Sequence, residues 1–306
     1  HRAVVRRRVA EVFFVSQQAI LLLPATSAFV YVLAALFIKQ SITAGSGQRQ
    51  VNLVVNLLPA MLFQSLWMLS GPVDWMQAWK PAVAAGTFFL GQVCTFLALQ
   101  NGEVSVTTPV LGTKVIFTAA FSALLFAQAL ELRWWLGALA CSLGVMLVTG
   151  ATWRTLAPRL RQRDALFAIG AACTFGLTDV LVQHWTHPLG VPAFIAIMFG
   201  VTGVLAAVIF LPGLKGGIPR AGLLPISLGA VLYSTQILIM AVALGLHRSA
   251  TAVNIVYGSR AIWSVALAWM LARFLHAEEA RDSREVMLRR LAGSVLVFGA
   301  VLAVLV

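Results

Sequence analysis

Residues 112–126 read GTKVIFTAAFSALLF, an apolar run that contains a single charged side chain, Lys114. Residues 258–264 read GSRAIWS, which repeats the start of that run in kind: a glycine, a hydroxyl residue, a cation, two aliphatic residues, an aromatic residue and a hydroxyl residue. A charge at the centre of a bilayer costs about 2.5–3.5 kcal/mol on insertion scales, so such residues usually face a polar cavity or a partner. The two stretches therefore predict duplicated membrane helices, each with a functional cation.

The composition agrees with a membrane protein. The chain has 306 residues, of which 60% are hydrophobic and 10% charged, and its mean hydropathy is +0.91. Its apolar runs are about 20 residues long, enough for a helix to cross a bilayer, and they lack the alternation of barrel strands. The formal net charge of +12 comes from Lys and Arg between these runs. Without a nucleic-acid-binding motif, that charge indicates membrane topology and contact with anionic lipids.

The apolar runs, bounded by Gly, Pro and charged residues, predict an all-α integral membrane protein with ten transmembrane helices. The expected helices are 20–38, 51–70, 81–100, 104–130, 132–150, 164–185, 191–211, 222–246, 249–275 and 287–306. The expected organisation is a basic N-terminal lead-in at 1–19, a first five-helix repeat at 20–150, a basic linker at 151–163 and a second five-helix repeat at 164–306.

Self-comparison supports the two repeats. ATSAF at 25–29 reappears as AACTF at 171–175, with the same spacing that separates GTKVIFT from GSRAIWS. Because each unit has an odd number of spans, the two copies enter the membrane from opposite sides and form an inverted repeat, an arrangement typical of secondary transporters. The alternative is an old duplication that is retained only for packing.

The block at 107–150, TTPVLGTKVIFTAAFSALLFAQALELRWWLGALACSLGVMLVTG, and its counterpart in the second half resemble the drug/metabolite transporter superfamily, in particular its EamA-like branch. The residues that carry the resemblance are PVL at 109–111, a short acidic turn at Glu131 and a glycine-rich helix after it, although Ala-Leu-Glu stands where the family usually has Gly-Glu-Arg. The resemblance implies alternating-access transport of a small metabolite. Superfamily members that carry phosphorylated sugars place cations in the corresponding helices, which implies an anion.

Lys114 and Arg260 occupy equivalent positions in the repeat and are the only basic residues deep within predicted spans. Their neighbours at helical spacing give each half an aromatic and a hydroxyl group on the same predicted surface. Two glutamines form a second symmetric pair, which could contact substrate or join helices. The candidate substrate-binding residues are Lys114, Arg260, Tyr257, Trp263, Phe117, Thr118, Ser264, Gln92 and Gln236.

Of the 10 acidic residues, only Asp179 lies inside a predicted span. We expect it to be a salt-bridge partner of Lys114 or Arg260; the alternatives are a proton-coupling carboxylate and a polar residue near the far membrane interface. Because one carboxylate cannot neutralise two cations, the excess positive charge points to an anionic substrate, an anionic lipid or an uncharged lysine. A purely structural role of both cations is the alternative.

These observations predict a secondary active transporter for a small organic anion or zwitterionic metabolite. The alternatives are an exporter of amino acids or amphipathic drugs, in which the cations are structural, and a non-transport membrane scaffold or lipid scramblase. No catalytic motif, metal cluster or nucleotide-binding loop is present in the sequence, so we expect no enzyme activity and no cofactor. Expected partners are a small-molecule substrate, membrane lipids and a coupling proton or counter-substrate, without nucleic acid, in a bacterial inner membrane.

Overall fold

The computed structural model describes residues 17–101, 104–150, 162–212, 214, 216–275 and 284–305. Within these ranges 85% of the chain is helical and no strand occurs. The helices are α2 (Gln17–Ile20), α3 (Leu22–Thr43), α4 (Gln48–Leu62), η1 (Phe63–Leu69), η2 (Trp75–Gln77), α5 (Trp79–Asn101), α6 (Val104–Leu111), α7 (Lys114–Phe126), α8 (Leu132–Val148), α10 (Arg163–Trp185), α11 (Val191–Phe210), α12 (Arg220–Leu246), α13 (Ala250–Tyr257), α14 (Arg260–Leu275) and α15 (Arg284–Leu305), where η marks 3₁₀ helices. Most of the predicted lead-in and linker lies outside the described residues.

The described helices include seven that are long and apolar enough to cross a membrane, and α8 is a shorter apolar helix of 17 residues. Their outer surfaces carry exposed aliphatic side chains, such as Leu124 on α7, Val204 on α11 and Leu224 on α12. A surface of this kind suits lipid rather than water. The protein is therefore an all-α, multi-pass membrane protein. The predicted ten spans and the inverted repeat stay predictions.

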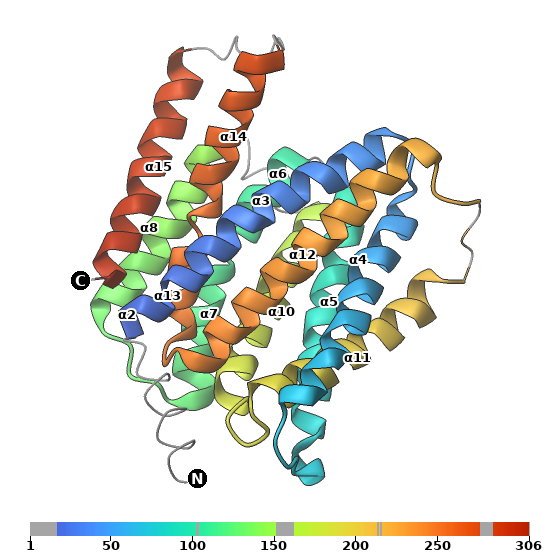
Figure 1. Ribbon diagram of the computed structural model, residues 1–306. Helices are drawn as coiled ribbons and strands as arrows, with labels where there is room; N and C mark the ends of the chain where they lie inside the picture. Colours follow the sequence, from blue (N-terminus) through green and yellow to red (C-terminus); the bar gives the residue numbers. More distant parts are fainter. Residues whose placement is uncertain are drawn as a thin grey trace.

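The helices of the two chain halves pack against one another rather than forming two separate bundles. The partners are α3 with α12, α4 with α11, α5 with α10, α7 with α13, and α8 with α15. Figure 1 shows α3 and α12 side by side, and α8 next to α15. Each of these pairs joins one helix from before the predicted linker to one from after it.

Two predicted helices are interrupted, which corrects the expectation of continuous spans at 104–130 and 249–275. The first is split between α6 and α7, and the second between α13 and α14. At both breaks the chain makes a tighter turn: the Thr113 N–H donates to Val110 O and the Ser259 N–H donates to Val256 O, both at 3.0 Å. These i to i−3 hydrogen bonds are of the 3₁₀ type.

Close packing on α8 explains why glycine stands at both breaks. A Cβ atom at Gly112 would lie 2.7 Å from Val145 Cγ1, and one at Gly258 would lie 2.3 Å from Cys141 Sγ. Both glycines therefore let their turns approach the same face of α8. The helix predicted at 104–130 also ends earlier than expected, at Phe126, because Ala127 takes a left-handed conformation with φ of 49°.

Candidate functional site

Both intramembrane cations begin a helix. Lys114 is the first residue of α7, and Arg260 is the first residue of α14, directly after the two breaks. A helix N-terminus carries partial positive charge, so a cation there is opposed by the helix dipole and needs another source of stabilisation. The two side chains find different sources.

Lys114 forms an ion pair with Asp179 of α10. The Lys114 Nζ lies 2.6 Å from Asp179 Oδ2, and the two side chains are only 15% and 10% exposed. The α7 backbone reaches α10 through Gly176, where an added Cβ would lie 3.0 Å from Phe117 Cβ and 3.1 Å from Thr118 N. This close approach brings the lysine within reach of the carboxylate. Asp179 thus balances the charge of Lys114.

Arg260 is held by aromatic rings instead. Its Cζ lies 4.9 Å from the ring centre of Tyr257 and 5.3 Å from that of Tyr31 on α3. Among the described residues, Arg260 has no carboxylate within ion-pair distance. A guanidinium over tyrosine rings gains cation–π attraction but keeps its full positive charge.

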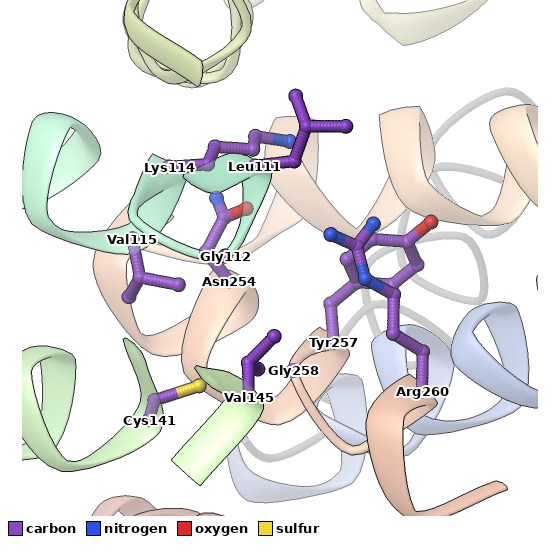
Figure 2. A pocket seen from close by; sticks show the side chains of 10 residues that line it. All are labelled: Leu111, Gly112, Lys114, Val115, Cys141, Val145, Asn254, Tyr257, Gly258 and Arg260. Atoms are coloured by element: carbon purple, nitrogen blue, oxygen red, sulfur yellow. The ribbon is translucent and has the colours of Figure 1, made fainter. Parts of the chain in front are cut away.

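Tyr257 connects the two cations. Its ring centre is 5.9 Å from Lys114 Nζ, while Arg260 approaches the same ring. Lys114 and Arg260 also line one small pocket, and Figure 2 shows the Arg260 guanidinium against Tyr257 in it. The other lining residues come from α6, the two breaks, α7, α8 and α13: Leu111, Gly112, Val115, Cys141, Val145, Asn254 and Gly258. The pocket lies where both interrupted helices meet α8.

All 3 tyrosines of the chain gather at this place. Tyr31 and Tyr257 meet edge to face with ring centres 6.1 Å apart, and Tyr31 and Tyr233 pack against the buried cluster that contains Tyr257. Gln92 on α5 donates a hydrogen bond of 2.6 Å to the Tyr233 hydroxyl. Gln92 thus belongs to the polar surroundings of the site without lining the pocket itself.

The remaining predicted site residues lie outside the pocket. Gln236 donates to Ser27 Oγ at 3.1 Å and joins α12 to α3. The Thr118 hydroxyl donates to Lys114 O and the Ser264 hydroxyl to Ala261 O, so each bonds its own helix. Trp263 is 42% exposed and packs edge to face on Phe29, with ring centres 5.3 Å apart. Phe117 lies against α10 at Gly176.

Tyr31 was not among the sequence candidates. Asn254, which is 2% exposed, also lines the pocket. The signal that could have identified Tyr31 is the scarcity of tyrosine, since the chain has 3 and each lies within a predicted span. A side chain that is rare in the chain and repeatedly placed at membrane depth is a reasonable site candidate.

Polar side chains fix the start of α13, which carries Asn254 and Tyr257. The Ser249 hydroxyl accepts from Ala252 N at 3.2 Å, and Gln183 Oε1 accepts from Ala250 N at 3.0 Å. His247 Nδ1 accepts from Ser249 N at 3.0 Å, and burial lowers the pKa of His247 below 6.5. The neutral imidazole therefore suits this turn. Among the described residues no group of three His, Cys, Asp or Glu side chains could hold a metal ion.

Comparison with known families identifies the first half of the chain. Residues 18–150 match the model of the EamA-like transporter family. This segment, somewhat less than half of the chain, matches a family of the drug/metabolite transporter superfamily. The family resemblance predicted from the sequence is confirmed. The EamA-like segment contains α3 to α8, including Lys114 and the first interrupted helix.

A solved crystal structure has a similar fold over nearly the whole chain. That structure superposes with a TM-score of 0.70 at 16% identity, over 93% of this chain and 96% of the other. At such identity the likeness concerns the fold alone. No curated protein matches the chain. The apolar helices and the match of residues 18–150 to a transporter family both indicate a multi-pass membrane protein.

Proposed function

We propose that the protein is a secondary transporter that works by alternating access and moves a small organic anion or zwitterionic metabolite across the bacterial inner membrane. The observation that carries the proposal is Arg260, a cation between two tyrosine rings that has no carboxylate partner among the described residues. A guanidinium fork is well suited to bind a carboxylate or phosphate with two hydrogen bonds.

The pairing of helices supports the proposed inverted repeat. Exchange of the two halves turns the pair of α3 with α12 into the pair of α10 with α5, and both pairs exist. The pairs of α4 with α11 and α8 with α15 map onto themselves under this exchange. A pseudo-two-fold axis of this kind lets two states of similar energy arise by exchanging the conformations of the halves. The domain boundaries at 20–150 and 164–306 belong to this proposal.

In the proposed mechanism, the substrate's acidic group binds Arg260, and Tyr31 and Tyr257 contact the rest of the molecule. The tyrosines hold the guanidinium in place before substrate arrives, which reduces the conformational freedom lost on binding. Closing one side of the pocket and opening the other then requires movement of the helix segments on either side of the breaks. Because glycine stands at both breaks, no bulky side chain obstructs the contact between these segments and α8.

A second candidate function is export of amino acids or amphipathic drugs, with the cations in structural roles. Two observations favour it: Asp179 already neutralises Lys114, and most pocket residues are apolar or aromatic. In that case the bound molecule would contact the rings, and Arg260 would only stabilise Tyr31 and Tyr257.

The test is thermal unfolding of the detergent-purified protein with organic carboxylates, organic phosphates, amino acids and cationic drugs. A ligand at 100 times its dissociation constant stabilises the fold by about 2.7 kcal/mol. We expect an anion to stabilise the wild type and Arg133→Gln, but not Arg260→Gln. Arg133 is a matched control because it is an exposed arginine, with a side chain 51% exposed, away from the pocket.

Uptake of the stabilising anion into proteoliposomes then tests transport. Equal stabilisation of the wild type and Arg260→Gln by every effective anion would overturn the proposal. Stabilisation only by cationic or neutral aromatic compounds, unchanged in Arg260→Gln, would favour the second candidate.

A further inference from the structure

The charges around the pocket do not balance. Lys114 and Arg260 contribute two positive charges, and Asp179 contributes one negative charge at ion-pair distance from Lys114. No other Asp, Glu, Lys or Arg among the described residues lines the pocket. The tyrosines that surround Arg260 supply rings without net charge. The empty site therefore carries one excess positive charge.

Because the Lys114–Asp179 pair is largely buried, the excess positive charge beside it has a strong influence on ligand binding. Asp179 is 7% exposed, and the paired side chains of Lys114 and Asp179 are shielded by α7 and α10. At an effective dielectric constant of about 20, two unit charges interact roughly four times as strongly as in bulk water. Exposed charges are screened by water and salt, whereas a largely buried pair such as Lys114 and Asp179 is screened much less. Ligand charge therefore has a large effect on binding at this position.

Only a ligand with one net negative charge cancels the excess positive charge of the site. A monovalent anion at Arg260 makes the loaded site neutral. A divalent anion leaves one uncompensated negative charge, and it also lies close to Asp179, because both cations approach the same Tyr257 ring. A zwitterion or a neutral molecule brings no net charge, so the loaded site keeps one excess positive charge. The desolvation of an unbalanced charge disfavours each of these alternatives.

We propose that the site selects organic anions with a single negative charge, and that Asp179 sets this valence by cancelling Lys114. The inference rests on the proposed function, since it narrows the substrate of the same site. Asp179 acts here as a specificity-determining residue: it sets the charge that a ligand must bring, without contacting the ligand.

The test uses two sets of compounds that share a carbon skeleton and differ in charge. One set is butyrate, succinate, 4-aminobutyrate and butyramide, and the other, in which the dicarboxylate has one further carbon, is phenylacetate, phenylmalonate, phenylglycine and phenylacetamide. Dissociation constants are measured at pH 8 by thermal unfolding and by competition against the best anion. In the wild type we expect the monocarboxylate of at least one set to bind about tenfold or more tightly than its dicarboxylate and its zwitterion, which corresponds to at least 1.4 kcal/mol.

Three variants change the site charge. Asp179→Asn raises it by one, so the ratio of monocarboxylate to dicarboxylate affinity should move about tenfold toward the dicarboxylate. Lys114→Gln lowers it by one, so the preference should move toward the zwitterion. Lys114→Gln with Asp179→Asn removes the ion pair but restores the wild-type charge, so it should restore the preference for the monocarboxylate even where absolute affinity falls.

The double variant also keeps the test informative if Asp179→Asn fails to fold with an unpaired lysine. Tight binding of dicarboxylates or zwitterions by the wild type, or a double variant that retains anion binding without the monocarboxylate preference, would overturn the valence inference alone. Absence of any anion whose binding depends on Arg260, in either set or in the wider screen, would overturn the proposed function as well.

Discussion

Arg260 and Lys114 hold equivalent places at the starts of α14 and α7 but are stabilised by different chemistry. A carboxylate 2.6 Å away cancels the charge of Lys114, whereas two rings hold Arg260 without cancelling its charge. Only the second arrangement leaves a cation available to an incoming anion. The asymmetry between two otherwise corresponding residues therefore assigns them separate tasks in the proposed site.

The ring of Tyr31 gives a prediction at this scale. Tyr31→Leu removes one of the two rings against Arg260, and a desolvated cation–π contact contributes up to about 2 kcal/mol. We expect the affinity for the anion to fall by roughly threefold to thirtyfold, because the guanidinium loses its fixed position. Titration of the purified variant measures this loss. Tyr31→Phe keeps the ring and should stay within about twofold of the wild type; equal losses in both variants would assign the effect to the hydroxyl instead.

Sequence reasoning located part of this site. The repeat spacing identified Lys114 and Arg260 as equivalent, and helical spacing put Tyr257 close to Arg260. Tyr31 could not be located in this way, because it reaches Arg260 only through the packing of α3 on α14. Trp263 was placed on the Arg260 surface by the same spacing rule, yet it lies on the outside against Phe29. Three residues along a helix leave a rotation of about 60°, enough to move a side chain off a narrow pocket.

At the scale of helices, the length of the apolar runs predicted where spans lie, but the sequence did not predict where two of them are interrupted. Runs of about 20 apolar residues locate spans because the bilayer fixes the length of a crossing helix. The breaks after Leu111 and Tyr257 depend instead on contact with α8, because the glycine that follows each of these residues packs directly against that helix. Such contacts are tertiary and leave no period in the sequence.

The contact between α8 and α15 gives a prediction at the scale of elements. A Cβ at Gly293 would lie 2.6 Å from Gly144 O and 2.7 Å from Val148 N, and backbone atoms cannot rotate away. Gly293→Ala should therefore force α15 away from α8 and destabilise the protein by about 1–3 kcal/mol. The midpoint of thermal unfolding in detergent measures the effect.

Gly299 on the same helix is the matched control, because a Cβ there meets nothing within 4 Å. Gly299→Ala should leave the midpoint unchanged or raise it slightly, since alanine favours helix over glycine by up to about 1 kcal/mol. Equal midpoints for the two variants would contradict the close contact of α8 with α15.

At the scale of the whole molecule, composition and span length predicted an all-α membrane protein, and the residues of the first half predicted the family that residues 18–150 match. The interleaving of the halves, with α3 on α12 and α5 on α10, was not predicted. An internal repeat states which segments correspond but not which ones touch. Which helices of the two units touch is decided by the packing of their surfaces, and the sequence pattern describes those surfaces only as apolar.

The excess positive charge at the empty site has an electrical consequence. In the proposed cycle the site is neutral when it crosses with a monovalent anion, and it carries one charge when it returns empty. Moving one charge through the full membrane potential is worth about 2.3 kcal/mol per 100 mV. The voltage therefore acts on the return step and leaves the loaded step unaffected.

Proteoliposomes with a potassium diffusion potential can separate the two steps. Exchange of labelled for unlabelled anion, with saturating anion on both sides, uses only loaded crossings and should proceed at the same rate at 0 mV and at about 100 mV of either sign. Net uptake into empty vesicles needs the return step and should change with voltage. Exchange as sensitive to voltage as net uptake would mean that the loaded site is charged. If the expected pattern holds, the membrane potential of the cell drives this transporter through its empty binding site.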